Sequence, residues 1–257
     1  FSLCKADDFI EFSKKILKYG VCAFFPTLAT DSVENLQKQI SEIKKAMQLQ
    51  ENSLEPLAKI LGVHLEACFL NPVKKGIHDE NLLLKPTIEN FKLLEDDIIK
   101  IVTLAPELDE GNLLCAYLKE KGIRVSAGHC MGADLSHVDQ VTHLYNAMGA
   151  FSHRTQSTVV SALCNDNIYT EIIADGIHVQ KDVLNITFRT KPLNKIILIS
   201  DALPITHSDK DSMDFCSKKV FLQNGKAVDS NGTIAGSTAF VYDIIKMLVN
   251  QGMLDLR

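Results

Sequence analysis

The sequence predicts an α/β protein folded as a (β/α)8 TIM barrel. Short apolar segments alternate with helical or crossover-length segments, which is typical of a parallel sheet covered on both faces. Polar residues follow these apolar segments at their C-terminal ends, and in such a barrel those ends form the catalytic face. The main alternative is a Rossmann-like open sheet, but no glycine-rich phosphate loop follows any of the predicted strands.

The helices are predicted from apolar residues at helical spacing and from capping signals. The first covers 7–19 and ends at Gly20, where a C-terminal cap belongs. Asp31 and Glu34 resemble a capping box, and the apolar face of the next helix continues to Met47. The later helical segments are part of 82–94, then 112–121, and the end of the chain from Met247.

Seven strands are predicted, and each is a short apolar run. They are 21–25, 60–65, 98–104, the runs that open at Val125 and at Val141, 168–174 and 196–200. Seven strands leave the barrel one short. The missing strand is expected before Phe1, because residues 1–20 already correspond to the helix after it. Residues 1–257 are therefore interpreted as one catalytic barrel domain, incomplete at both ends.

One connection is unusually short. About eight residues separate Gly132 from Val141, fewer than the roughly 10–12 that a parallel crossover with a helix needs. Either this helix is reduced to a stub, or a segment is missing from the sequence.

The composition is that of an ordinary soluble globular protein, with 46% hydrophobic and 23% charged residues. A net charge of −5 and the lack of a Lys/Arg cluster argue against a nucleic-acid partner. No run of about 18 apolar residues indicates a membrane span. The seven cysteines are odd in number and form no C-x-x-C pair. Free thiols in a reducing cytoplasm are therefore predicted.

Three polar residues at strand ends predict a metal site. Glu66 follows the second strand, and His129 and His143 follow the runs that open at Val125 and Val141. One carboxylate and two imidazoles with an open coordination position are typical of a catalytic Zn²⁺ site, and Fe²⁺ is an alternative. Asp201, after the last strand, is the candidate general base that takes a proton from the metal-bound water.

Eight short motifs, spread over about 20–249, occur in an order that resembles one family. They are His64-Leu65-Glu66, Lys74-Lys75-Gly76-Ile77-His78, Leu104-Ala105-Pro106-Glu107, Gly128-His129, Thr142-His143-Leu144-Tyr145-Asn146-Ala147-Met148, Ile173-Ala174-Asp175-Gly176-Ile177-His178, Ser200-Asp201-Ala202 and Gly232-Thr233-Ile234-Ala235-Gly236-Ser237. The chain resembles the N-acetylglucosamine-6-phosphate deacetylases of the amidohydrolase superfamily. The resemblance implies a metal-dependent amidohydrolase barrel that removes acetate from N-acetylglucosamine 6-phosphate. The same chemistry on N-acetylgalactosamine 6-phosphate or an N-acyl amino acid, or a barrel that has lost catalysis, are the alternatives.

The resemblance also implies roles for individual residues. Glu66, His129 and His143 correspond to metal ligands, and Asp201 to the general base. His78 corresponds to the histidine that polarises the amide carbonyl. The implied substrate-binding residues are Ile77, His78, Asn146, Ala147, Arg154, Asp175, Gly176, Ile177, His178 and the pocket-lining loop Ile234, Ala235 and Gly236.

The resemblance further implies a homodimer, in which Arg154 reaches the phosphate in the neighbouring subunit's site. It implies a small β-sandwich built from both chain ends, which this sequence is expected to lack. The remaining histidines His64, His137 and His207 are interpreted as structural, and His64 is expected to point away from Glu66.

Overall fold

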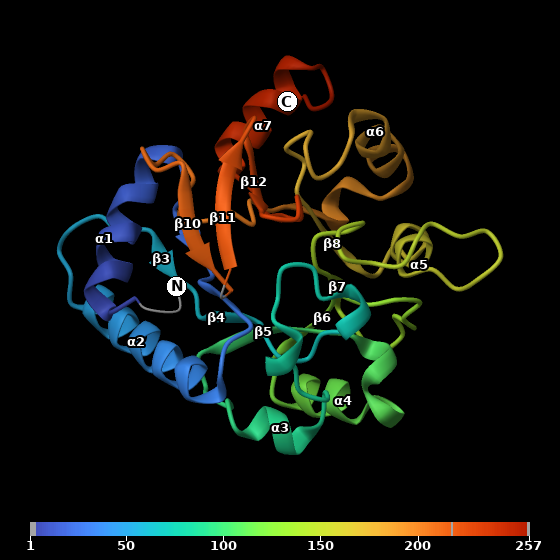
Figure 1. Ribbon diagram of the computed structural model, residues 1–257, viewed down its shortest axis with the longest axis horizontal. Coiled ribbons are helices and arrows are strands. Elements are labelled where there is room, and N and C mark those ends of the chain that lie inside the picture. Colours follow the sequence, from blue (N-terminus) through green and yellow to red (C-terminus); the bar gives the residue numbers. More distant parts are fainter. Residues whose placement is uncertain (1–3, 217, 256–257) are drawn as a thin grey trace.

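The computed structural model describes residues 4–216 and 218–255 as an α/β fold around a curled, seven-stranded parallel sheet. The strand order is β2-β4-β5-β6-β7-β8-β9, so neighbours along the chain are neighbours in the sheet. These strands are β2 (Thr27–Ala29), β4 (Val63–Glu66), β5 (Ile99–Leu104), β6 (Arg124–Ala127), β7 (Gln140–Val141), β8 (Tyr169–Ile172) and β9 (Ile196–Leu198). Helices surround the sheet (Figure 1). The predicted barrel type is confirmed as a partial barrel.

The helices and 3-10 turns connect the strands along the outside. The α-helices are α1 (Ala6–Ile16), α2 (Val33–Glu51), α3 (Ile88–Lys92), α4 (Leu113–Glu120), α5 (Thr158–Cys164), α6 (Lys181–Thr190) and α7 (Val241–Asn250). The 3-10 turns are η1 (Leu17–Tyr19), η2 (Pro72–Lys74), η3 (Glu80–Leu82), η4 (Pro106–Leu108), η5 (Glu110–Asn112) and η6 (Leu193–Lys195). Gly20, with φ of 75°, caps the first helical segment as predicted. The predicted capping box at Asp31 and Glu34 is wrong, because Ser32 is the N-cap and accepts a hydrogen bond from the Asn35 amide.

The first two predicted strands are each divided. Within 21–25 only β1 (Ala23–Phe24) forms, and it pairs with β3 (Lys59–Ile60) outside the barrel sheet. The barrel strand β2 begins after Pro26, whose nitrogen cannot donate to a sheet ladder. Gly62 separates β3 from β4 with φ of +134°, and a Cβ there would lie 2.5 Å from the Ile98 carbonyl oxygen. The turn at this position therefore requires glycine.

No helix connects β6 to β7 in the described part of the chain. Residues 128–139 form an irregular loop, and β7 pairs directly with β6 through Ser126 and Gln140. A single turn from Leu135 to Val138 is what stands in place of a crossover helix. Leu135 and Val138 in this loop are 4% exposed, so they provide apolar cover beside the sheet in place of a helix.

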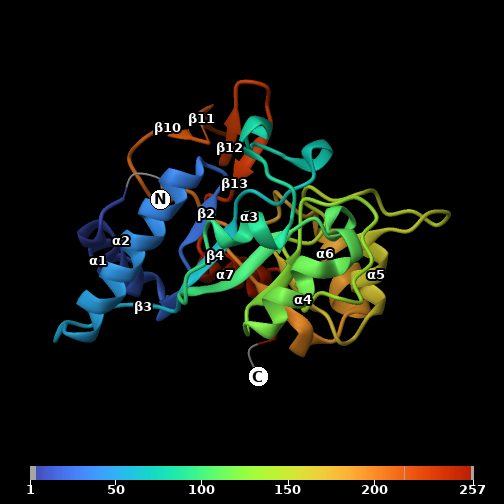
Figure 2. The ribbon, with the colours of Figure 1, turned by 90° about the horizontal axis from the view of Figure 1, so that it is seen from below.

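A four-stranded antiparallel sheet was not predicted. It consists of β10 (Ser212–Phe215), β11 (Lys218–Gln223), β12 (Lys226–Asp229) and β13 (Ile234–Gly236). It lies at one end of the barrel strands (Figures 1 and 2). Its apolar face packs on Ile77, Leu203 and Ile205. The prediction of a loop at 234–236 is wrong, because these residues pair with β12.

The largest apolar cluster lies between the barrel strands and helices α1 to α5. Strand residues such as Val63, Leu65, Val102, Val125 and Val141 are fully buried in it. Strands buried on both faces explain why these segments are almost continuously apolar in sequence. No helix of the described residues has the length and apolar character needed to cross a membrane.

Candidate metal centre

Glu66, His129 and His143 converge at one edge of the barrel sheet. Glu66 is the last residue of β4, and the two histidines each lie two positions beyond the ends of β6 and β7. One ligand atom from each lies within 4.8 Å of the others, and all three residues are 5–7% exposed. The expected convergence of these three residues is therefore found in the structure.

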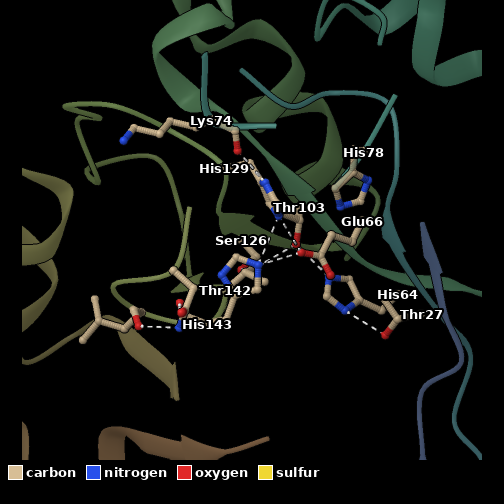
Figure 3. Close-up of polar contacts among 12 residues, drawn as sticks. Thr27, His64, Glu66, Lys74, His78, Thr103, Ser126, His129, Thr142 and His143 are labelled. Atoms are coloured by element: carbon tan, nitrogen blue, oxygen red, sulfur yellow. Dashed lines mark hydrogen bonds and ion pairs between the residues drawn. The ribbon is translucent and has the colours of Figure 1, made fainter. Parts of the chain in front are cut away.

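The ligand atoms point at one another (Figure 3). Glu66 Oε1 is 3.1 Å from His129 Nε2 and 2.8 Å from His143 Nε2, and the two Nε2 atoms are 3.2 Å apart. On the far side of its ring, His129 Nδ1 donates to the Lys74 carbonyl oxygen at 2.8 Å. This hydrogen bond places the proton of the neutral ring on Nδ1 and leaves Nε2 as a lone-pair donor.

The electrostatics of the cluster also suit a cation. Burial alone would raise the pKa of Glu66, but the two histidines outweigh it and hold this pKa well below its ordinary range. Burial lowers the pKa of His143, but the Glu66 carboxylate outweighs it and raises this pKa to about 9. Without a metal, a proton therefore lies between His143 and Glu66. A divalent cation fits the same position, because it would satisfy the carboxylate and both imidazoles together.

Both histidines lie on strained backbone. His129 has φ of 48° and His143 has φ of 35°, in a region that residues with a Cβ seldom adopt. Each strand ends just before this turn of the chain, which directs the imidazole across the edge of the sheet. Strain at such positions persists only where the surroundings fix the conformation.

His78 lies beside His129, with ring centroids 4.9 Å apart. The Thr30 amide donates to His78 Nδ1 at 3.3 Å. The Thr30 hydroxyl lies 2.7 Å from the same nitrogen. Burial and the neighbouring His129 lower the pKa of His78 to about 3. His78 is therefore a neutral imidazole near Glu66, His129 and His143, which we call the ligand cluster.

Asp201 follows β9 and is held by its backbone. Its carbonyl oxygen accepts a hydrogen bond from the Ser237 amide at 2.8 Å, and its φ is 46°. Its carboxyl group has no hydrogen-bond partner within the described ranges 4–216 and 218–255. Burial and repulsion by Glu66 raise the pKa of Asp201, and the nearby histidines oppose this. The carboxyl group is thus free to exchange a proton close to the ligand cluster.

The turn 175–178 holds His178 through Asp175. Asp175 Oδ1 accepts from the amides of Ile177 and His178 at 2.9 and 2.8 Å, and Oδ2 accepts from His178 Nδ1 at 2.8 Å. Gly176 supplies φ of 76° for this turn. The Asp175 carboxylate is therefore occupied within the chain, and its side chain orients His178.

Asn146 and Ala147 lie three and four residues after His143. Asn146 Nδ2 donates to the carbonyl oxygens of His143 and Leu144, each at 3.3 Å, and Ala147 has φ of 51°. Arg154 lies on the loop before α5, is exposed, and donates from Nε to His153 Nε2 at 3.0 Å. The structure thus places the Asn146 turn beside the ligand cluster and leaves Arg154 at the surface.

The remaining predicted contacts lie where the four-stranded sheet meets the barrel. Ile77 is 4% exposed and packs on that sheet. The segment of Ile234, Ala235 and Gly236 ends beside Asp201. A Cβ added to Gly236 would lie only 2.9 Å from the Asp201 carbonyl oxygen. The close approach requires glycine at this position.

Sequence reasoning misplaced one residue and missed two. The prediction that His64 points away from Glu66 is wrong, since residues two apart in a strand share a face. Thr30, which fixes His78, was missed because nothing local marks it. Glu171 was also missed, although a glutamate within the apolar run 168–174 was a visible signal. It is 6% exposed and accepts from Gln140 Nε2 at 2.7 Å, and burial with repulsion by Glu66 raises its pKa to about 8.

The predicted free cysteines are confirmed, because all seven are unpaired. Cys68 and Cys130 lie close to the ligands in sequence and are fully buried. Burial raises the pKa of each thiol to about 12. Both therefore remain protonated and act as packed apolar groups.

Known proteins identify the relatives of this chain. No family model matches it. It is 32% identical over 255 residues to N-acetylglucosamine-6-phosphate deacetylase of Bacillus subtilis, which covers 95% of this chain and 62% of the relative. The solved deacetylase of Pasteurella multocida is 29% identical with a TM-score of 0.87, over 98% of this chain and 67% of that one.

The same fold occurs in a Mycobacterium smegmatis deacetylase variant, solved in complex with N-acetyl-D-glucosamine 6-phosphate. It has 24% identity and a TM-score of 0.82, over 92% of this chain and 63% of that one. The chain spans about 62% of the length of the Bacillus relative. The predicted resemblance is confirmed: in sequence and in fold, this chain is related to the N-acetylglucosamine-6-phosphate deacetylases.

Proposed function

We propose that the chain carries the active site of a metal-dependent hydrolase that removes acetate from N-acetyl-D-glucosamine 6-phosphate and yields D-glucosamine 6-phosphate. The observation that carries this proposal is the buried convergence of Glu66, His129 and His143. The relatives named as deacetylases support the choice of reaction. Residues 1–257 would form the catalytic barrel domain of this enzyme.

Glu66, His129 and His143 would hold one divalent cation, with Zn²⁺ the expected ion and Fe²⁺ the alternative. When bound, such an ion lowers the pKa of a bound water toward about 7 and polarises a carbonyl oxygen. The Nδ1 hydrogen bond from His129 to the Lys74 carbonyl oxygen supports this role, because it keeps Nε2 free for the cation.

Asp201 would act as the general base and then as the general acid. Its carboxyl group is free of hydrogen bonds from the described residues, and its raised pKa favours holding a proton after taking it. That proton would then pass to the departing amine nitrogen. His78, a neutral imidazole beside His129, would donate a hydrogen bond to the carbonyl oxygen as negative charge develops on it.

The sugar phosphate would lie between the ligand cluster and the loops at the carboxyl ends of the barrel strands. Asn146, the Ala147 backbone and His178 would contact the sugar, and the turn that Asp175 stabilises would orient His178. Ile77 and the segment of Ile234, Ala235 and Gly236 would line the same site.

Arg154 would bind the phosphate of a neighbouring subunit in a homodimer. Its exposed position on a surface loop supports this role, and its Nε bond is to the neighbouring His153 on the same loop. The unpaired cysteines support a reducing, cytoplasmic location.

Acetate release from N-acetyl-D-glucosamine 6-phosphate by the full-length protein, with and without a chelator, tests the proposal. We expect release that the chelator abolishes and added Zn²⁺ restores. N-acetylgalactosamine 6-phosphate and an N-acyl amino acid, assayed in parallel, separate the alternative substrates. A purified protein that binds metal but releases acetate from none of them would contradict a hydrolase and indicate a barrel that has lost catalysis.

A further inference from the structure

A row of polar side chains crosses the barrel interior next to the ligand cluster. Thr27, His64, Thr103, Thr142 and Ser126 come from or directly follow five neighbouring strands, and we call them the hydroxyl belt (Figure 3). Thr27 Oγ1 lies 3.3 Å from His64 Nδ1, and His64 Nε2 lies 2.7 Å from Thr103 Oγ1. Thr142 Oγ1 is 2.7 Å from Thr103 Oγ1 and 2.5 Å from Ser126 Oγ. Thr142 thus joins Thr103 to Ser126, and it is the belt member that directly precedes the ligand residue His143.

The belt is not needed to fill the core. Thr103, Ser126 and Thr142 are at most 1% exposed, at positions where barrels usually carry branched apolar side chains. A buried hydroxyl costs free energy unless it has a partner, and here each belt member is paired with another. Valine would occupy the place of threonine without this requirement. The hydroxyl groups therefore have a purpose other than packing.

The belt contacts the backbone segments that carry all three ligands. His64 lies two residues before Glu66 on the same face of β4, and Thr142 directly precedes His143. Gly128, directly before His129, lies against the belt. A Cβ there would be 2.7 Å from Thr103 Cγ2 and 2.9 Å from Thr142 Cβ.

This location matches a need of the site. His129 and His143 have positive φ, and strained residues of this kind keep their conformation only in surroundings that allow no other. Hydrogen bonds have fixed directions and lengths, so a paired hydroxyl row sets the relative positions of the strand ends more sharply than apolar contacts do.

We propose that the hydroxyl belt positions the three metal ligands, with Thr142, next to His143, as a positioning residue. The proposal rests on the proposed metal-dependent function. It assigns the belt no contact with substrate. Its effect is to hold Glu66, His129 and His143 close enough together to share one cation before that cation arrives.

The test is the substitution Thr142→Val in the full-length protein, which replaces the hydroxyl with a methyl group of similar size. We expect the apparent dissociation constant for zinc, measured at fixed pH by competition with a chromophoric chelator, to rise about ten-fold. The visible absorption spectrum of the cobalt-loaded protein should also change, because it reports the coordination geometry. Thr142→Ser keeps the hydroxyl, and it should restore both readouts.

Thr170→Val is the matched control. Thr170 is fully buried in β8, and its hydroxyl has no hydrogen-bond partner in the part of the chain that the structure describes. The same chemical change should therefore leave zinc affinity and the cobalt spectrum as in the wild type. A shift as large as that of Thr142→Val would mean that any buried hydroxyl matters, and it would overturn the proposal.

Wild-type zinc affinity and an unchanged cobalt spectrum in Thr142→Val would also overturn the proposal. If that variant does not fold, Ser126→Ala removes one of the two hydroxyl contacts of Thr142, and a several-fold weaker zinc affinity is expected; unchanged affinity would overturn the belt equally. A wild-type protein that binds zinc but releases no acetate overturns the proposed function alone. A wild-type protein that binds no zinc overturns both.

Discussion

Strands β4, β6 and β7, which carry the proposed ligands, have a hydrogen-bonded neighbour on each side, whereas β9, which leads to Asp201, is the last strand of the described sheet. The difference extends to burial. Leu65 and Val141 are fully buried, but Ile197 of β9 is 37% exposed. The ligands are thus positioned by the sheet itself. Asp201 depends instead on the Ser237 amide and the close approach of Gly236.

This comparison indicates that the proposed metal ligands and the proposed general base are held by different parts of the structure. The proposed ligands follow inner strands of the sheet, and Asp201 follows the outer strand β9, next to the end of the four-stranded sheet. A change at Asp201 should therefore leave metal binding largely intact.

The largest effect is expected from Glu66→Ala. This change removes the carboxylate that both imidazoles face, so zinc binding and acetate release should both fall to background. Elemental analysis of the purified protein and an acetate assay measure the two losses. Glu110→Ala, at an exposed position, is the control and should keep both. Full metal content in Glu66→Ala would contradict the assignment of this ligand.

Asp201→Asn should abolish most turnover and spare the metal. Loss of a general base that also acts as the acid typically costs about 10²–10⁴-fold in rate. The zinc content should stay at the wild-type level, because Asp201 is not among the three converging ligands. The acetate assay and elemental analysis again give the answer. Asp209→Asn, an exposed carboxylate eight residues further along the chain, is the matched control. Full activity in Asp201→Asn would refute its role.

The inner half of the site was the half that the sequence predicted well. Apolar runs identified β4, β6 and β7, and parallel strands bring their carboxyl ends to one edge, so Glu66, His129 and His143 could be grouped without coordinates. The error at His64 came from misapplying the two-residue period of a strand, which was available in the sequence.

The outer half was predicted less well, for physical reasons. The strands β10 to β13 are short and partly exposed, so their apolar pattern is weak. Two Asn-Gly pairs were hairpin signals that the sequence offered: Asn224-Gly225 between β11 and β12, with φ of 51° and 76°, and Asn231-Gly232 between β12 and β13. Contacts such as Thr30 with His78 join residues 48 positions apart, and no local pattern reports them.

Arg154→Ala should have a smaller effect, limited to the phosphate. One charge-assisted contact is worth about ten-fold in affinity, so KM for the phosphorylated sugar should rise about ten-fold with little change in kcat. Activity on unphosphorylated N-acetylglucosamine should not change. Arg189→Ala, exposed on α6, is the control. An equal loss on both substrates would show that Arg154 does not recognise phosphate.

The smallest effect is expected in the pH dependence of stability of the metal-free protein. Burial and repulsion by Glu66 raise the pKa of Glu171 from its ordinary 4.5 to about 8. Against the effect of burial, Glu66 raises the pKa of His143 from 6.5 to about 9. Both groups bind their proton more tightly in the folded state. Their stabilising contribution is therefore complete below the ordinary pKa and is lost as pH rises through the folded one.

Thermal unfolding of the chelator-treated protein should thus shift down by a few degrees between about pH 5 and pH 9. Zinc-loaded protein should not show this loss, because the cation replaces the proton at His143 and offsets the charges of the carboxylates. Glu171→Gln removes one of the two titrating groups from the inner half, and it should make the decline of the metal-free protein shallower below pH 8. Stability that instead rises with pH would show that the inner half does not hold these protons, and that its three ligands are arranged differently when no metal is bound.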